Sequence, residues 1–328
     1  DHAVRQAAAR HALEAMTEQE PGEVWIIDDT GLLKQGKHSV GAQRQYTGSA
    51  GKVTNCQIGV SLSVATRTEQ LPIDFALYLP EGWLTDVHRR REARIPDEIA
   101  FKTKPELALE MVHQALVDEV PPGVVLADAA FGTSRDFRDG IRKLGLQYAV
   151  AVDPRTVVSV IDKLGRRRDE IVSVEALAQR IESQGGFRRC TWRSGSKEDL
   201  SARFALRRVV PAHDDARGIE KREALSLLIE WRDGEDEPAN YFLCSLPSRW
   251  TRKKLVRLVM QRWRTERAYQ DLKGELGLDH YEGRRFPGWH HHISVVLCCY
   301  AFIVAERVRH SPPSAGNALE DVTQPVAA

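Results

Sequence analysis

The sequence contains few cysteines, no long apolar run and almost no net charge. Its five cysteines are scattered over 328 residues without metal-ligand spacing, which favours a reducing cytoplasm over a disulfide framework. No stretch approaches the ~18 apolar residues of a membrane span, and no secretory signal peptide opens the chain. The net charge of +1 favours no class of partner. These absences predict a cytoplasmic protein without membrane contact.

What is present is ordinary for a globular protein, with 42% hydrophobic and 28% charged residues. The length allows one large domain with an insertion, or two domains. Residue 1 is Asp rather than Met, so we expect a further segment upstream. The Ala-rich residues 2–19 carry apolar side chains at helical spacing and predict a helix.

The chain can be arranged around Val24-Trp25-Ile26-Ile27-Asp28-Asp29. Four apolar residues between Pro21-Gly22 and Gly31 predict a buried central strand. Because burying a carboxylate is costly, we expect Asp28 where this strand emerges. There it could bind a cation or a reacting group, or merely cap the following turn.

The same pattern recurs at Val124-Val125-Leu126-Ala127-Asp128, a short apolar run that again ends in a carboxylate. Strand-like runs at 56–65, 73–79 and 147–152, with helical patterns from Pro105 and near 133–144, give an α/β order. Functional groups collect at strand ends in such sheets. Two strand-end aspartates therefore favour a shared site over two separate caps.

Residues 32–55 predict a long, exposed, basic loop or hairpin, with four glycines and four Lys or Arg. A loop of this length is usually functional. Lys34 and Lys37 lie next to the strand-end acids, which suggests that the loop faces a polyanion. A solvated hairpin without a partner is an equally good interpretation.

Residues 154–250 contain basic clusters and strand-like runs at 204–210, 225–231 and 241–246, with a short helix expected near 174–181. We interpret them as a β-rich insertion, and an independent second domain is the alternative.

Residues 251–276 form the clearest helical pattern, with Thr251 as N-cap and Gly277 at the end. Arg262, Glu266 and Lys273 lie at i, i+4 and i+11, on one face over about 16 Å. Glu266 is the only acid among seven Lys or Arg between residues 252 and 267, which suggests a specific role. A solvated face with an intrahelical ion pair is the plainer alternative.

The C-terminal part predicts a polar loop at 279–287, an apolar core helix at 293–307 and a disordered tail at 311–328. Three consecutive histidines, His290 to His292, point in different directions from a regular helix. A zinc site there is therefore not favoured.

The two strand-end aspartates, followed after a β-rich segment by a helical Glu, resemble the DDE transposases of bacterial insertion sequences. The first acid of that family lies in an Asp-x-Thr strand end, which Asp28-Asp29-Thr30 matches. The second precedes Ala and an aromatic-Gly pair, as in Asp128-Ala129-Ala130-Phe131-Gly132.

One branch of the family carries a Tyr-Arg-Glu-Lys signature on its catalytic helix. Arg262, Glu266 and Lys273 match its last three residues with the family's spacing, whereas Val259 stands where the Tyr would fall. This departure concerns a DNA contact of the Tyr and not the metal site. The resemblance covers about residues 22–307.

The resemblance implies a ribonuclease H-like mixed sheet flanked by helices, with the β-rich insertion before the catalytic helix. It implies that Asp28, Asp128 and Glu266 are catalytic and hold two Mg²⁺ ions, for which Mn²⁺ could substitute. Arg262 and Lys273, together with Lys34 and Lys37, would contact DNA. We expect Arg262 and Lys273 to be largely solvent-accessible.

On this interpretation residues 1–153 form the first part of the catalytic core, 154–250 the insertion and 251–310 the catalytic and C-terminal helices. The implied partner is double-stranded DNA, as terminal inverted repeats and target, bound by a homodimer in the nucleoid-associated cytoplasm of a bacterium. The implied reaction cleaves DNA at element ends and joins the 3′-hydroxyl to a target. The alternatives are a nuclease of the same fold that only hydrolyses, an inactive DNA-binding regulator, and a two-carboxylate glycosidase, which would leave the basic helix unexplained.

Overall fold

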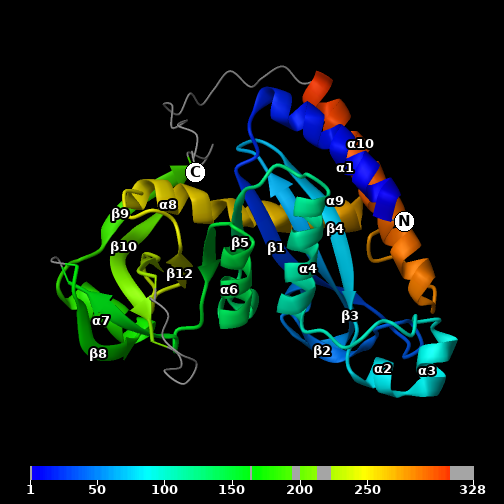
Figure 1. The fold of residues 1–328 in the computed structure, drawn as a ribbon, viewed down its shortest axis with the longest axis horizontal. Helices are drawn as coiled ribbons and strands as arrows, with labels where there is room; N and C mark the ends of the chain where they lie inside the picture. Colours follow the sequence, from blue (N-terminus) through cyan, green and yellow to red (C-terminus); the bar gives the residue numbers. More distant parts are fainter. Residues whose placement is uncertain (1, 163–164, 194–199, 213–222, 311–328) are drawn as a thin grey trace.

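The computed structural model describes residues 2–162, 165–193, 200–212 and 223–310 (Figure 1). Its core half is a sheet whose strands are β1 (Val24–Leu33), β2 (Gln43–Thr47), β3 (Lys52–Ala65), β4 (Gln70–Tyr78), β5 (Val124–Ala127) and β6 (Tyr148–Ala151). β1 is central, with β3 antiparallel on one side and β5 parallel on the other. β4 pairs with β3, and β6 lies parallel to β5. This α/β arrangement is consistent with the expected ribonuclease H-like fold.

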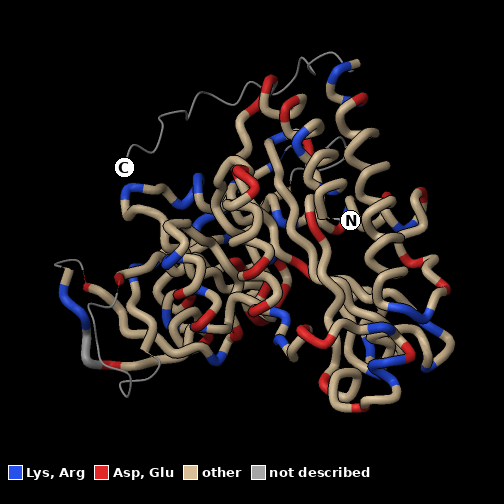
Figure 2. The backbone as a smooth tube through the Cα atoms, turned by 45° about the vertical axis from the view of Figure 1, so that its right-hand side comes forward, with Lys and Arg blue, Asp and Glu red and all other residues tan. Residues whose placement is uncertain are grey.

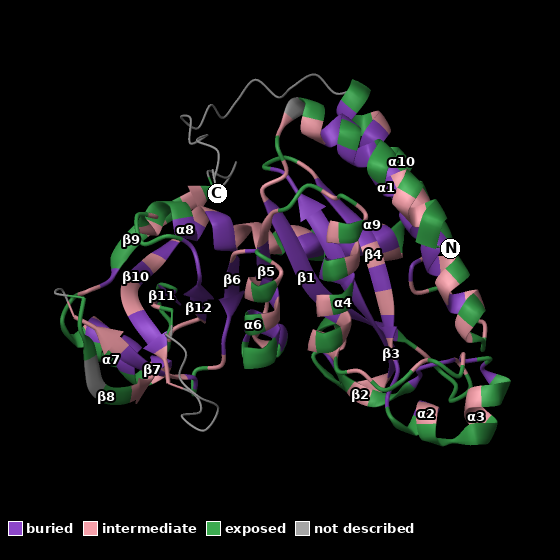
Figure 3. Cartoon of the chain, in the orientation of Figure 1, coloured by how far each residue is buried: buried purple, intermediate pink, exposed green. Residues whose placement is uncertain are grey.

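Helices cover both faces of β1, which is why its apolar run is continuous rather than alternating. Trp25 and Ile27 face the core beneath α4 (Lys104–Val117) and α6 (Arg135–Lys143). Val24 and Ile26 face α8 (Arg252–Val259) on the other side. All four side chains are fully buried, and the sheet strands form the buried centre of Figure 3.

The remaining strands extend the same sheet beyond β6. They are β7 (Val157–Ile161), β8 (Arg167–Ser173), β9 (Arg188–Arg193), β10 (Leu200–Pro211), β11 (Leu225–Trp231) and β12 (Asn240–Cys244). β12 pairs with β6, and β11, β10, β7 and β8 follow in order, with β9 beside β10. α7 (Val174–Ser183) is the expected short helix. The β-rich character of 154–250 is thus confirmed, and its status as an insertion stays a prediction.

Two long helices lie side by side at the far edge of the core, beyond β4 (Figure 1). They are α1 (His2–Gln19) and α10 (Phe286–His310). By length and composition α10 could span a membrane, but half of its apolar window is buried inside the protein. It packs against α1 and β4, as expected for the core helix of a soluble protein.

Three further segments have a more detailed structure than the sequence indicates. Two short helices, α2 (Gly82–Thr85) and α3 (Val87–Glu92), lie between β4 and α4. Of the loop and the hairpin expected over residues 32–55, the structure confirms the hairpin, because β1 reaches Leu33 and β2 and β3 then form an antiparallel pair. The helix expected over 251–276 is divided into α8, the 3-10 segment η3 (Met260–Trp263) and α9 (Arg264–Gly274). The tail at 311–328 lies outside the described residues.

Candidate active site

The strand register sets two carboxylates next to each other. In the parallel β1–β5 ladder the last paired residues are Ile27 and Ala127, so Asp28 and Asp128 follow at equivalent positions. Neighbouring strands lie about 4.8 Å apart. Two residues one hundred positions apart in the chain therefore lie side by side.

The sequence predicted that Asp28 lies at the end of β1, and this prediction is wrong. β1 continues through Asp28, which pairs with Ser61 of β3, and runs on to Leu33. The side chain is consequently buried, with Asp28 only 8% exposed. The guanidinium of Arg262 compensates for this burial, with its Nη1 3.1 Å from Asp28 Oδ2.

The electrostatics of Asp28 are unusual for an aspartate. Its pKa is raised to about 7, mainly by burial; Arg262 opposes this shift, and the neighbouring Asp128 contributes to it. The hydroxyl of the buried Tyr269, which shares a 2.6 Å hydrogen bond with Ser61, has its pKa raised by burial and by Asp28. No sequence pattern indicated Tyr269, because a buried helical Tyr looks like an ordinary core residue.

Asp128 is held by the helix that follows it. Its carboxylate caps α5 (Ala129–Gly132) and accepts a 2.9 Å hydrogen bond from the Ala130 amide. Burial raises its pKa, and the nearby charge of Arg262 lowers it. The charge of Arg262 thus acts on both carboxylates. Asp128 both caps a helix and lies beside Asp28.

Asp29 alternates to the opposite face of β1 from Asp28. Its Oδ2 lies 2.8 Å from the amine of Lys104 at the start of α4. Asp29 therefore has its own cationic partner, although its charge still helps to raise the pKa of Asp28 and of Asp128.

Glu266 lies in the first turn of α9 and its side chain is exposed. Among the described residues, the Glu266 side chain has no hydrogen bond or ion pair. Within the same described residues, no three His, Cys, Asp or Glu side chains are grouped so as to hold a metal ion. The structure therefore brings Asp28 and Asp128 together and leaves Glu266 outside the pair. The alternative interpretation, an intrahelical ion pair between Glu266 and Arg262, does not hold among the described residues, because Arg262 pairs with Asp28 instead.

The four basic residues expected to contact DNA differ in their surroundings. Arg262 and Lys273 are only partly exposed, contrary to expectation, because Arg262 pairs with Asp28 and the Lys273 amine donates to the Gly31 carbonyl at 3.0 Å. Lys34 donates to the carbonyls of Asp279 and Tyr281, at 3.0 and 2.6 Å. Burial lowers the pKa of Lys34 and of Lys273. Lys37 is exposed.

Val259, which stands where the signature has Tyr, is buried with Val24 and Ile26 in the core under α8. It therefore packs against the sheet. His290 is partly buried beside Phe286 and Trp289, and this burial lowers its pKa to about 4.

Two family matches cover most of the chain. The family described as DDE superfamily endonuclease matches residues 1–199, and the family described as Transposase DDE domain matches residues 102–302. Together they include Asp28, Asp128 and Glu266.

One curated relative is a probable transposase for insertion sequence element IS701 from Microchaete diplosiphon. It is 28% identical over 141 residues, which make up 43% of this chain and 34% of the relative. The chain thus matches about a third of that relative's length. Because each family match spans more than half of the 328 residues, the chain belongs to the DDE superfamily of endonucleases and carries a transposase DDE domain.

Proposed function

We propose that the protein is the catalytic part of a transposase, which cleaves DNA at the ends of its element and joins the new 3′-hydroxyl to target DNA. The observation that carries this proposal is the β1–β5 register, which aligns Asp28 with Asp128. Both lie within the family matches. A pair of carboxylates on adjacent strands of such a sheet is the arrangement that phosphodiester chemistry with divalent ions requires.

The superfamily uses divalent metal ions, and the donor set fits them. Carboxylate oxygens are the ligands that Mg²⁺ prefers, and two adjacent acids with raised pKa values gain most from a bound cation. Asp28, Asp128 and Glu266 would hold two Mg²⁺ ions, with Mn²⁺ as a substitute. Such ions, when bound, lower the pKa of a water and stabilise the leaving oxygen.

The protein's own side chains have separate tasks in this proposal. Arg262 favours the ionised form of Asp28 by its positive charge and would be the first cation that an approaching phosphate meets beside the two acids. Lys273, next to the β1 backbone at Gly31, and Lys37 in the loop after β1 would contact further phosphates. Lys34 would serve indirectly, by holding the 279–281 segment.

The proposed partner is double-stranded DNA, first the terminal inverted repeats and then the target, bound by a homodimer. Figure 2 shows basic and acidic residues interspersed along the chain, so DNA contact would depend on local groups of cations rather than on net charge. The proposed location is the bacterial cytoplasm, at the nucleoid.

The test is a cleavage and strand-transfer assay with a duplex that carries the inverted repeat flanking the gene. A transposase nicks this duplex in Mg²⁺ and joins the 3′ end to a plasmid. Nicking without joining identifies a nuclease that only hydrolyses. Binding of the duplex without nicking in Mg²⁺ or Mn²⁺ identifies a regulator and contradicts the proposal.

A further inference from the structure

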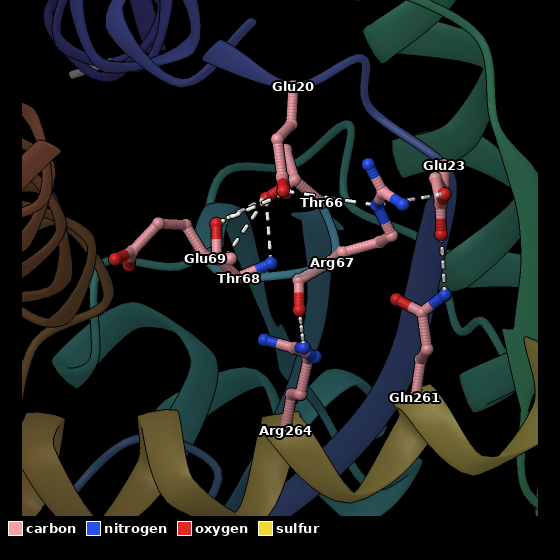
Figure 4. Close-up of polar contacts among 8 residues, drawn as sticks. All are labelled: Glu20, Glu23, Thr66, Arg67, Thr68, Glu69, Gln261 and Arg264. Carbon is pink, nitrogen blue, oxygen red and sulfur yellow. Dashed lines mark hydrogen bonds and ion pairs between the residues drawn. The ribbon is translucent and has the colours of Figure 1, made fainter. Parts of the chain in front are cut away.

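The break in the catalytic helix is a point of attachment to the sheet. η3 separates α8 from α9, and the residues around it direct polar side chains to segments that flank β1, β3 and β4. Gln261 Nε2 donates to Glu23 Oε2 at 2.8 Å. Arg264 donates to the main-chain carbonyl of Arg67. Figure 4 shows Gln261 and Arg264 extending from the helix toward Glu23 and Arg67.

The attachment points are themselves fixed. Glu23 lies directly before β1, five residues from Asp28, and Arg67 lies in the turn between β3 and β4. The Arg67 guanidinium is 3.8 Å from Glu20 and 4.0 Å from Glu23. Glu20 also accepts a 3.1 Å hydrogen bond from Thr68 (Figure 4). The helix is thus attached to the residue directly before the strand that carries Asp28 and to the turn between β3 and β4.

A third contact lies deeper. The buried Thr265 hydroxyl accepts a 3.0 Å hydrogen bond from Gln70 at the start of β4. With Arg262 bound to Asp28, four of the five residues from 261 to 265 have polar contacts with the β1–β3–β4 part of the protein.

Stability alone does not explain this arrangement. Gln261 Oε1, Arg264 Nε and Gln70 Oε1 are buried without a hydrogen-bond partner among the described residues, and such atoms destabilise a fold. An unbroken helix with an apolar contact would avoid that cost. Short 3-10 segments inside helices often mark functional positions.

We propose that Gln261 and Arg264 are positioning residues, which with Glu23 and Arg67 set the rotation of η3 and the start of α9. They keep Arg262 directed at Asp28 and set the direction from which Glu266, two residues after Arg264, approaches the two aspartates. This inference rests on the proposed function, because it assumes that Glu266 joins Asp28 and Asp128 in holding divalent ions.

The first test replaces Gln261 with Ala. The cleavage rate should fall about 10- to 100-fold, as expected for a small misplacement of a reacting group. The affinity for Mn²⁺ alone, titrated without DNA, should fall in the same direction as in Glu266→Gln. The melting temperature should change little, because Glu23 is near the surface and keeps Arg67 beside it. The matched control is Gln179→Ala, on the exposed side of α7, which should behave as wild type in each assay.

The second test reverses the hydrogen bond. Gln261→Glu alone places two carboxylates against each other and should lower Mn²⁺ affinity and cleavage. Adding Glu23→Gln restores one hydrogen-bond donor and one acceptor, and should recover most of the Mn²⁺ affinity and most of the cleavage rate.

The inference is overturned if Gln261→Ala binds Mn²⁺ and cleaves as wild type. It is equally overturned if Gln261→Ala is deficient but the reversed pair recovers only melting temperature. Wild-type protein that binds Mn²⁺ but never cleaves would contradict the proposed function instead, and the Mn²⁺ titrations would still decide on the positioning role.

Discussion

Asp28 combines burial with a charge that burial disfavours. It is 8% exposed, lies beside a second carboxylate, and has one cation, Arg262, at 3.1 Å. Its pKa of about 7 means that near neutral pH the metal-free carboxyl group is partly protonated. A divalent cation binds the ionised form, so metal binding and proton release are coupled at this residue.

The first prediction concerns pH and stability. The pKa of Asp28 rises from 3.8 in the unfolded chain to about 7 in the folded protein, so between these values the folded state binds more protons. Stability therefore falls as pH rises through this window, and the full loss is present above pH 7. Asp28→Asn should remove this loss and raise the melting temperature in EDTA at pH 8. If the melting temperatures of the two proteins changed in parallel from pH 5 to 8, the pKa of the Asp28 carboxyl group would not be raised by folding.

Asp29 should behave differently, because its carboxylate pairs with Lys104 on the other side of β1. Asp29→Asn removes this pair and should cost about 1–2 kcal/mol of unfolding free energy, while it keeps most of the cleavage activity. Asp28→Asn in the same assay should be inactive. Equal inactivity of the two variants would mean that both acids serve the reaction.

At the scale of elements, the sequence predicted the presence of the apolar strands better than it predicted where they end. β1 continues through Asp28, Asp29 and Gly31, although Asp and Gly have poor strand propensity. It does so because each pairs with β3, a contact distant in sequence. The 251–276 pattern likewise contains no Pro or Gly before Gly274. The break in this helix coincides with tertiary contacts of Gln261 and Arg264, which no local pattern reveals.

The motif around Asp128 has a structural reason for its glycine. A Cβ at Gly132 would lie 2.0 Å from the Ala151 carbonyl oxygen and 2.8 Å from Val150 Cβ. Gly132→Ala must therefore displace α5, which Asp128 caps. We expect a loss of about 1–3 kcal/mol in unfolding free energy and weaker binding of Mn²⁺. The control is Gly82→Ala, whose Cβ would meet nothing within 4 Å; an equal effect of both variants would contradict this explanation.

The loop after β1 contains two lysines with different predicted roles. Lys37 is exposed, so Lys37→Ala should weaken DNA binding and reduce the slope of log affinity against log salt by about 1. Its melting temperature should not change. Lys34 binds the carbonyls of Asp279 and Tyr281, so Lys34→Ala should lower the melting temperature. DNA titrations at several salt concentrations and thermal melting measure these effects. A loss of stability in Lys37→Ala and a loss of DNA affinity alone in Lys34→Ala would contradict the two roles.

For the whole molecule, the sequence indicated the α/β class, the β-rich segment and the acids that lie near each other at β1 and β5. It could not indicate that the twelve strands of the described residues form one sheet, because pairing of β12 with β6 joins residues about ninety positions apart. It also predicted that Glu266 converges with the aspartates. In the structure Glu266 is exposed, and Arg262 is the residue of that helix that pairs with Asp28. The site therefore contains an acid pair, a cation that neutralises it, and a third acid near the surface.

The most direct test of this account is the single-turnover rate at which Glu266→Gln cleaves terminal-repeat DNA in Mg²⁺. Glu266 has no polar partner among the described residues, so the variant should fold as wild type. It should bind the DNA at least as tightly, because one negative charge near the phosphates is removed. Its cleavage rate should nevertheless fall by orders of magnitude, because the amide lacks the charge that a Mg²⁺ ligand needs. Cleavage by Glu266→Gln at the wild-type rate would contradict the assignment of Asp28, Asp128 and Glu266 as the catalytic acids.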